Sequence, residues 1–548
     1  MRIQGRFMIL NPPRFCRAMK VRHDEPDIRF LKRNIMKRSF MPVLFAWLVL
    51  FSGSVSSLAI AQESSPASSE IMTMQEAMTS LIEGPWPEKK LAVDYLLKNG
   101  DPALLPQLEE FRSNTNRRVR RLIKPVINLL KNKAGLASPD KEDRRAAARD
   151  LGARGTPEAL PILKHALSGE KEHWVRYDLE EAIHLLNLES ADPQVQFASI
   201  QKLGDMRSAA ALPILQDFAN QRAGNLEQQA LKDESEKASR RIQKWQDVTR
   251  GIEMLLQGLS LGSILLLMAL GLAIVFGLMG VINMAHGEMM MIGAYATFVV
   301  QEGFRAYLGE HLFDYYFFLA LPCAFFVAAF IGWILEGTLI RFLYGRPLET
   351  LLATWGVGLV LIQTARLIFG DLTAVQAPSW LRGGAQVVVG VQLPYNRLFI
   401  IFLALFCVAG IYILLFRTGI GLRVRAVLQN REMSACLGIP TRKLDAYTFA
   451  FGSGLAGLAG SALTLVGNVD PELGRNYIVD SFMVVVAGGV GKLAGTITAA
   501  FGIGTLNKLL EPGFGAVYGK VIILVLIILF LQVRPSGLFA LKGRHLDS

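Results

Sequence analysis

The side chains most able to do chemistry gather in one short segment near the middle of the chain. It reads Gly280-Val-Ile-Asn283-Met-Ala-His286-Gly287-Glu288. Ionisable groups in apolar, membrane-like surroundings are costly, and they therefore mark candidate solute paths. The segment could instead form a structural elbow, because a carboxylate such as Glu288 is favoured in the first turn of a helix. Elbow and path lining both stay open for five candidates: Asn283, His286, Gly287, Glu288 and Asp480.

A second segment, residues 417–443, carries six basic side chains and a single acidic one, Glu432. Its spacing predicts a short amphipathic helix followed by a glycine turn at Gly438, lying on the cytoplasmic membrane surface. An excess of basic residues is typical of cytoplasmic loops and explains the arginines. It does not explain the ordered Ala435-x-x-Gly438-Ile pattern, so the segment is kept as a candidate site.

The sequence shows no pattern of a hydrolytic or redox enzyme. The run Gly488-Gly-Val-Gly-Lys492 resembles a phosphate-binding loop, but Leu493 stands where that motif requires Ser or Thr, and the first glycine is misplaced. The four cysteines are Cys16, Cys323, Cys407 and Cys436. They form neither a CxxC metal pair nor a disulfide framework. We therefore expect no cofactor or metal in this chain, and no ATP hydrolysis by it.

The chain has two regions of different composition, which meet near residue 250, and both candidate segments lie in the second region. The 548 residues carry 58 Lys and Arg against 46 Asp and Glu, a net charge of +12. Residues 1–250 hold 39 of the basic and 31 of the acidic side chains, whereas residues 251–548 hold 19 and 15. A charged content of about 25% is typical of soluble domains, and long apolar stretches mark membrane spans. The sequence therefore predicts a soluble region followed by a membrane region, residues 252–548.

The membrane region contains about eight apolar segments that could cross, or nearly cross, ~30 Å of hydrocarbon. They are residues 254–278, 287–303, 316–340, 350–369, 397–416, 444–467, 481–507 and 517–533. Glycines within them are expected to let helix backbones approach closely. Glu336 and Arg366 are lesser site candidates, each of which could simply be paired with an opposite charge. Eight crossings would leave the basic C-terminus outside the cytoplasm, and a broken helix within 484–504 could change that count.

Residues 62–250 are helical in period and contain a repeat. Leu-Pro pairs recur at residues 105–106, 160–161 and 212–213. Because proline is typical of the first turn of a helix, the pattern predicts stacked helix pairs that bury a shared apolar stripe. The arrangement resembles a HEAT-like α-solenoid, and the alternative is a generic helical bundle. We assign residues 62–221 to this domain and residues 222–251 to a charged helical connector.

Residues 36–61 have the three parts of a secretory signal peptide. Lys37 and Arg38 form a basic start, an apolar run follows, and an Ala-x-Ala cleavage site ends at Ala61. This predicts that Met36 is the true start and that residues 1–35 are an upstream over-extension. The alternative is an uncleaved signal anchor with a basic cytoplasmic tail. In both cases the helical domain is exported to the periplasm.

The net charge does not indicate nucleic-acid binding. Residues 1–38 supply +8 of it, and residues 39–250 carry equal numbers of acidic and basic side chains. A nucleic-acid-binding protein needs its basic surplus on a folded face. We therefore expect no nucleic-acid partner.

Three segments resemble one family of transporters. The run 280–295, the loop 419–439 and the ending Arg534-Pro-Ser-Gly-Leu-Phe539 are similar to the signature, the cytoplasmic coupling loop and the C-terminal ending of branched-chain amino acid type ABC permeases. This resemblance covers residues 252–543. The long exported N-terminal region and the tail that begins Leu506-Asn-Lys-Leu-Leu-Glu-Pro512 resemble the urea ABC permease branch in particular.

The resemblance implies an all-α, multi-pass bundle in the bacterial inner membrane that imports urea by alternating access. It implies four kinds of partner besides lipid: a second permease subunit, two ATPase subunits that hold ATP and magnesium, a periplasmic solute-binding protein, and urea itself. An ATPase would contact Arg423, Arg425, Glu432, Ala435 and Gly438. Three alternatives stay open: import of branched-chain amino acids or short amides, a passive urea or amide channel, and a membrane-anchored scaffold.

Overall fold

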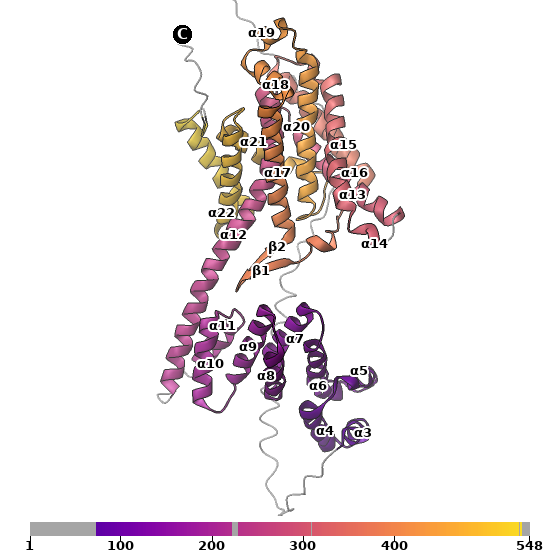
Figure 1. The fold of residues 1–548 in the computed structure, drawn as a ribbon, viewed down its shortest axis with the longest axis vertical. Helices are drawn as coiled ribbons and strands as arrows, with labels where there is room; N and C mark the ends of the chain where they lie inside the picture. Colours follow the sequence, from indigo (N-terminus) through magenta and orange to yellow (C-terminus); the bar gives the residue numbers. More distant parts are fainter. Residues whose placement is uncertain (1–72, 222–227, 308–309, 536, 540–548) are drawn as a thin grey trace, which may run out of the picture. The chain divides into compact units, whose positions relative to one another are not determined.

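The computed structural model describes residues 73–221, 228–307, 310–535 and 537–539 (Figure 1). Contacts divide the chain into two units, residues 1–73 and 74–548, and the second unit holds nearly all of the described residues. The predicted over-extension 1–35 and the predicted signal peptide 36–61 lie outside the described residues.

The first part of the second unit consists of short helices. They are α3 (Met74–Glu83), α4 (Trp86–Asn99), η1 (Pro102–Leu104), α5 (Leu105–Asn114), α6 (Arg117–Leu136), α7 (Lys141–Arg154), η2 (Pro157–Ala159), α8 (Leu160–Gly169), α9 (His173–Asn187), α10 (Pro193–Met206) and α11 (Ala211–Gln221). The predicted helix starts are confirmed, because each of the three Leu-Pro pairs lies in the first turn of α5, α8 or α11. Proline suits this position because its missing N–H has no partner in a first turn.

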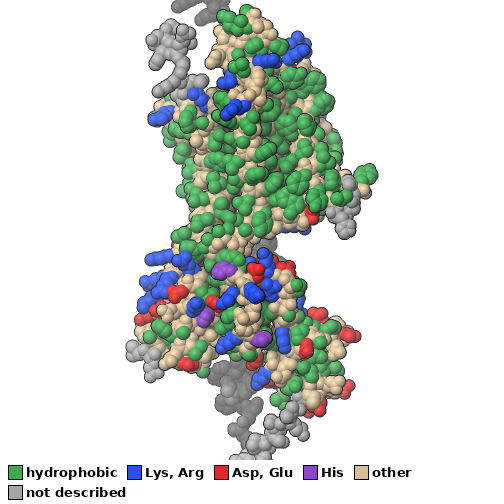
Figure 2. Space-filling view, viewed as in Figure 1, with side chains coloured by type: hydrophobic (Ala, Val, Ile, Leu, Met, Phe, Trp, Pro, Cys, Tyr) green, Lys and Arg blue, Asp and Glu red, His purple; other side chains and the backbone are tan. Residues whose placement is uncertain are grey.

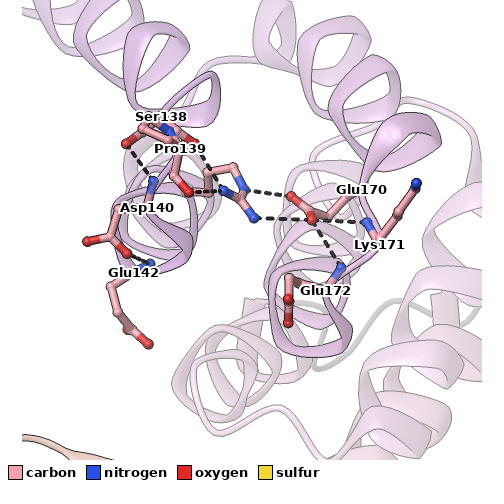
Figure 3. Close-up of polar contacts among 8 residues, drawn as sticks. Ser138, Pro139, Asp140, Glu142, Glu170, Lys171 and Glu172 are labelled. Atoms are coloured by element: carbon pink, nitrogen blue, oxygen red, sulfur yellow. Dashed lines mark hydrogen bonds and ion pairs between the residues drawn. The ribbon is translucent and has the colours of Figure 1, made fainter.

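Neighbouring helices of this region share local apolar cores. Leu129, Leu151 and Leu179 belong to one cluster that joins α6 to α9, and Leu203 and Leu215 belong to a second that joins α9 to α12. Ionic contacts add to these cores. Arg144 of α7 pairs with Glu170 at 2.8 Å and also donates to the carbonyl oxygens of Ser138 and Pro139 (Figure 3).

Helix α12 (Gln229–Met279) contains most of the predicted connector together with the predicted first span. Its N-terminal half carries charged residues, and its C-terminal half is apolar and buried. At Trp245 the indole N–H donates to the carbonyl oxygen of Val389 at 2.8 Å. The connector is therefore continuous with the bundle rather than a separate segment.

The bundle follows in chain order. Its elements are α13 (His286–Tyr307), α14 (Glu310–Phe313), α15 (Tyr316–Thr338), η4 (Ile340–Phe342), α16 (Pro347–Phe369), η5 (Ser379–Leu381), β1 (Gly384–Val388), β2 (Val391–Pro394), α17 (Tyr395–Arg417), α18 (Gly419–Gln429), α19 (Arg431–Cys436), α20 (Thr441–Leu463), α21 (Leu473–Gly488) and α22 (Leu493–Val533). The expectation of an all-α chain missed the antiparallel hairpin of β1 and β2. Its turn contains Gly390 with φ +85°, a conformation that glycine adopts at no steric cost.

Among the described residues, five helices are long and apolar enough to cross a membrane: α12, α15 continued through η4, α16, α17 and α22. Helices α13 and α20 fall outside this set, and both contain charged residues. Figure 2 shows apolar side chains over much of the face of the bundle, and Lys and Arg side chains near the end that carries α18 and α19. The described residues therefore support a multi-pass membrane protein, and the count of eight spans stays a prediction.

The predicted span 481–507 is wrong. Helix α21 ends at Gly488 and α22 begins at Leu493, so the chain breaks inside that segment. Gly489 and Gly491 both have positive φ, a backbone conformation that ends a helix and that other residues rarely adopt. This break lies within 484–504, where a broken helix is expected to change the number of membrane crossings. A second break, at Gly515 within α22, separates the predicted spans 481–507 and 517–533.

Candidate functional site

The candidate segment forms the connection between α12 and α13. Helix α12 ends at Gly280, whose φ of +63° turns the chain out of the helix. The backbone N–H of Met284 then donates to the hydroxyl of Thr354 in α16 at 3.1 Å, and His286 begins α13. The segment therefore forms a bend between two helices, which we call the elbow, and the bend is attached to α16; the choice between elbow and path lining stays open.

Two side chains of the elbow are buried with free polar atoms. Asn283 is 1% exposed, and neither its amide oxygen nor its amide nitrogen has a hydrogen-bond partner among the described residues. His286 is fully buried, with Nε2 at 3.2 Å from the carbonyl oxygen of Met268 and Nδ1 without a described partner. Buried polar groups are usually hydrogen-bonded, so free ones in a bundle of membrane helices mark a candidate contact for a polar solute or water.

Glu288 lies in the first turn of α13 and is also buried, with Oε2 lacking a partner among the described residues. Its carboxylate packs against Gly358 of α16, where an added Cβ would lie 3.1 Å from Oε1. The glycine thus provides the room that the carboxylate occupies. Together, the amide, the imidazole and the carboxylate offer donors and acceptors at one end of α13.

Gly287 and Asp480 have partners that explain their types. A Cβ added at Gly287 would lie 2.6 Å from the carbonyl oxygen of Gly474, so the glycine permits contact between α13 and the start of α21. The carboxylate of Asp480 pairs with the ammonium of Lys520 in α22 at 3.1 Å. The structure thus buries Asn283, His286 and Glu288 in the same short segment, with His286 against α12 and Glu288 against α16, and it places Asp480 in a contact between α21 and α22.

The basic loop folds as predicted, into helix and glycine turn. Helix α18 is followed by the six-residue α19, whose N-terminus is capped by the Asn430 side chain accepting from Met433 N at 2.9 Å. Gly438 ends α19 with φ +84°, and its N–H donates to the carbonyl oxygen of Ala435. Ile439 N donates to Ser434 O, which completes a glycine-type helix end.

Most of the candidate residues on these two helices face outward. Arg423, Glu432, Ala435 and Gly438 are exposed, whereas Arg425 is half-buried with its guanidinium over the Phe416 ring at 5.1 Å. Large apolar side chains are also exposed here, among them Leu422 at 62%, Met433 at 58% and Leu437 at 77%. Exposed apolar side chains among charged ones are typical of a protein contact surface.

A polar network that the sequence did not reveal holds α19 against the bundle. Arg431 of α19 pairs with the fully buried Asp445 of α20, and its guanidinium lies over the Tyr344 ring at 5.1 Å. The Tyr344 hydroxyl donates to Glu336 Oε1 at 3.0 Å, and burial raises the pKa of this phenol, which keeps it a donor. Glu336 is thus paired at an interface. Arg366, the other lesser candidate, pairs with Asp371 and Glu472.

The only signal for this network in the sequence was the position of Glu336 near the end of an apolar segment. In the sequence Arg431 is one of the basic residues of the loop 417–443, and nothing local shows that it will pair with Asp445 fourteen residues along the chain. The described residues contain no group of three His, Cys, Asp or Glu side chains that could hold a metal ion.

Comparison with known proteins supplies the family. A profile described as "branched-chain amino acid transport system / permease component" matches residues 254–531. A second, described as "PBS lyase HEAT-like repeat", matches residues 143–169, from α7 to α8. No solved structure matches the chain.

Several curated proteins are similar to the membrane region. The high-affinity branched-chain amino acid transport system permease protein BraD of Pseudomonas aeruginosa is 29% identical over 293 residues, which cover 52% of this chain and 95% of that protein. The probable branched-chain amino acid transport permease protein LivH of Methanocaldococcus jannaschii is 28% identical over 320 residues, or 54% of this chain and 95% of that protein. LivM of Escherichia coli is 25% identical, covering 52% of this chain and 70% of that protein.

Proposed function

Because the chain belongs to the family of branched-chain amino acid transport system permease components, we propose that it is the membrane permease subunit of an ATP-driven importer that carries urea into the cytoplasm. The observation that carries the transport role is the family match over residues 254–531, which starts in α12 and ends in α22. Residues 229–253, and the helices before them, lie outside that match.

The partners follow from this role. A periplasmic binding protein delivers the solute, a second permease subunit completes the pathway, and two ATPase subunits supply the energy. The ATPase contact is proposed at α18 and α19, where Arg423, Met433 and Leu437 are exposed and where the charge is basic. Alternating access is the mechanism: closure of the ATPase pair favours one of two bundle arrangements.

The proposed solute contact is the elbow of Asn283, His286 and Glu288. Urea is small, neutral and polar, so it needs hydrogen-bond donors and acceptors but no fixed counter-charge. The free amide atoms of Asn283 and the free Nδ1 of His286 offer both kinds of group in a buried setting. The long region before the bundle and the tail around Asn507, which resemble the urea branch, support the same solute.

A second candidate solute is a branched-chain amino acid or a short amide. The names of BraD and LivH support it directly, and the urea proposal has no support of that kind. An amino acid carries an ammonium and a carboxylate, which a path must match with charged or strongly polar groups. Glu288, buried with one free oxygen, is the group of the elbow that suits an ammonium.

The helices α3 to α11 are proposed to form a periplasmic solenoid that docks the binding protein. Stabilisation of the assembled complex is the alternative role. A transporter that lacks residues 74–221 should lose stimulation by the binding protein if docking is correct. If both assembly and stimulated transport persist without these residues, both roles are wrong.

The solute is tested by uptake into proteoliposomes that contain the assembled complex. We expect ATP-dependent accumulation of radiolabelled urea, which unlabelled urea but not leucine competes away. Leucine accumulation with no urea accumulation would favour the second candidate instead. Urea flux that needs no ATP would indicate a passive channel, and binding-protein effects without any flux would indicate a scaffold.

The coupling surface is tested with two double variants. Arg423→Glu with Met433→Glu alters an exposed arginine and an exposed apolar residue on α18 and α19, and it should abolish solute-stimulated ATP hydrolysis and uptake. Arg250→Glu with Val248→Glu makes the same two changes at exposed positions of α12 and should leave both intact. Equal loss in the two variants would contradict a coupling role for α18 and α19.

A further inference from the structure

A wide groove lies between α17, α18 and the start of α22. Its volume is about 790 Å³, and most of its wall is apolar. The wall includes Val408, Tyr412, Phe416, Leu428, Leu493 and Ile497. A groove of this size accommodates a ligand of several hundred daltons, well above a urea molecule or an amino acid. It is therefore unsuited to be the solute contact described above.

Two basic residues, Arg425 and Lys492, line the same groove, and no acidic residue lines it. Nε of Arg425 is buried without a hydrogen-bond partner, and no described acid lies within ion-pairing distance of either side chain. A buried guanidinium nitrogen without a partner is costly, because burial removes its hydrogen bonds to water. The site therefore has apolar walls and an unmatched positive charge.

The groove lies beside two membrane-type helices, near the end of one of them, and this position indicates the class of ligand. Helices α17 and α22 are both long and apolar enough to cross a membrane, and α18 lies at the end of α17. The basic residues thus lie near one membrane surface, with apolar walls formed by the adjoining helices. Basic pockets between membrane helices on the cytoplasmic side are suited to anionic lipid head groups.

We propose that this groove binds an anionic phospholipid, with its phosphate between Arg425 and Lys492 and its acyl chains along α17 and α22. The assignment to the cytoplasmic leaflet rests on the proposed function, whereas the site itself does not. A lipid suits the groove because it supplies one negative phosphate and two long apolar chains in a single molecule. Bound there, it would contact α18 and so stabilise the end of the bundle where ATPase contact is proposed.

The test uses the purified full chain in detergent, titrated with phosphatidylglycerol and, separately, with phosphatidylcholine of the same acyl chains. Native mass spectrometry counts the bound lipids. We expect retained phosphatidylglycerol and weak phosphatidylcholine binding. Arg425→Gln with Lys492→Gln should lower phosphatidylglycerol affinity about 30-fold, since each basic residue contributes about fivefold at an anionic lipid. Equal binding of the two lipids by the unaltered chain would overturn the proposal.

Two further variants test the site. The first is a control for the loss of charge, and the second distinguishes a bound lipid from a bound phosphate ion. Arg442→Gln with Lys443→Gln removes the same charge from exposed positions outside the groove and should change affinity less than twofold. Ala409→Trp fills the apolar wall while keeping both basic residues, and it should also weaken lipid binding. Unchanged binding by Ala409→Trp, or displacement of the lipid by inorganic phosphate, would show a simple phosphate site. A photo-crosslinker at position 425 that captures the second permease subunit in the complex would assign the groove to a protein contact instead.

Discussion

The helices before the bundle and the helices within it are held together by different means. In the first region, charged side chains join neighbouring helices: Arg145 of α7 pairs with Asp178 of α9 at 2.7 Å, and both are buried. In the bundle, glycines bring backbones into contact, as at Gly293 of α13 and Gly457 of α20. In lipid the apolar environment gives no reward for burying apolar side chains, so close backbone packing takes over.

Ion pairs in the bundle lie mainly near helix ends. Arg431 and Asp445 join α19 to α20 near the start of that helix, and Arg366 joins the end of α16 to Glu472. A charged pair is cheaper near a membrane surface than at its centre. The buried groups of the elbow, by contrast, lack complete pairing. The comparison therefore separates charged groups that hold helices together from buried polar groups that have atoms without a described partner.

The largest expected effect comes from a side chain placed in a glycine contact of the bundle. A Cβ at Gly293 would overlap the carbonyl oxygen of Gly457, so Gly293→Leu must push α13 and α20 apart. We expect loss of monodisperse protein after detergent extraction and loss of uptake. Gly303→Leu, on the same helix with no atom within 4 Å of an added Cβ, is the control and should retain both. Equal tolerance of the two changes would contradict packing through backbone contact.

The next effect comes from breaking the ion pair in the first region. Asp178→Asn leaves the buried Arg145 with only the exposed Glu142, 3.6 Å away, as a charged partner, and we expect a loss of about 3 kcal/mol in the unfolding free energy of α7 and α9. Hydrogen exchange of peptides from these helices in the full chain measures it. The double variant Arg145→Met with Asp178→Leu should recover much of the loss, because no buried charge then remains unpaired: Arg149, the second partner of Asp178 at 3.1 Å, is 46% exposed and is solvated.

The control for this prediction is an exposed pair of the same region. Asp205 and Arg241 lie 2.9 Å apart, with side chains 60% and 49% exposed. Exposed pairs contribute about 0–1 kcal/mol, so Asp205→Asn should change hydrogen exchange little. A similar loss in both variants would mean that burial does not decide the strength of these contacts.

The sequence predicted where helices and turns begin better than which residues they contact. The starts of α5, α8 and α11 follow from proline, the turn at Gly438 follows from its spacing, and the elbow follows from a polar run between apolar ones. These are local signals, set by a few adjacent residues. The glycines of 484–504 indicate a broken helix but do not locate the break at 489–492, because glycines in a membrane helix also serve packing.

Contacts between distant residues could not be predicted in this way. Nothing near Asn283 indicates that its amide is buried without partners, and nothing near Arg425 indicates a groove formed with α22. The pairing of Arg431 with Asp445 could not be predicted for the same reason. Each depends on how helices far apart in the chain pack, and hydrophobic periodicity reports only which face of a helix is buried.

The smallest expected effect is a pH dependence of the first region. Glu181 of α9 is 8% exposed, and burial raises the pKa of its carboxyl above the ordinary value of 4.5, although a hydrogen bond from Ser208 lowers it in part. Above that value the unfolded chain releases the proton before the folded chain does. The stabilising contribution is therefore complete below about pH 4.5 and is lost as the pH rises through the folded pKa.

Two variants make this dependence visible. Glu181→Gln cannot ionise, so the unfolding free energy of α9 should fall less between about pH 4 and about pH 8 than in the unaltered chain. Ser208→Ala removes the hydrogen bond that favours the charged carboxylate, so its fall should be steeper. Hydrogen exchange of α9 peptides at several pH values, corrected for intrinsic rates, gives both slopes. Parallel slopes in all three proteins would show that the buried carboxyl is ionised in the folded state at no cost. The contrast between a region that tolerates buried charge and a bundle whose ion pairs lie mainly near helix ends would then need another cause.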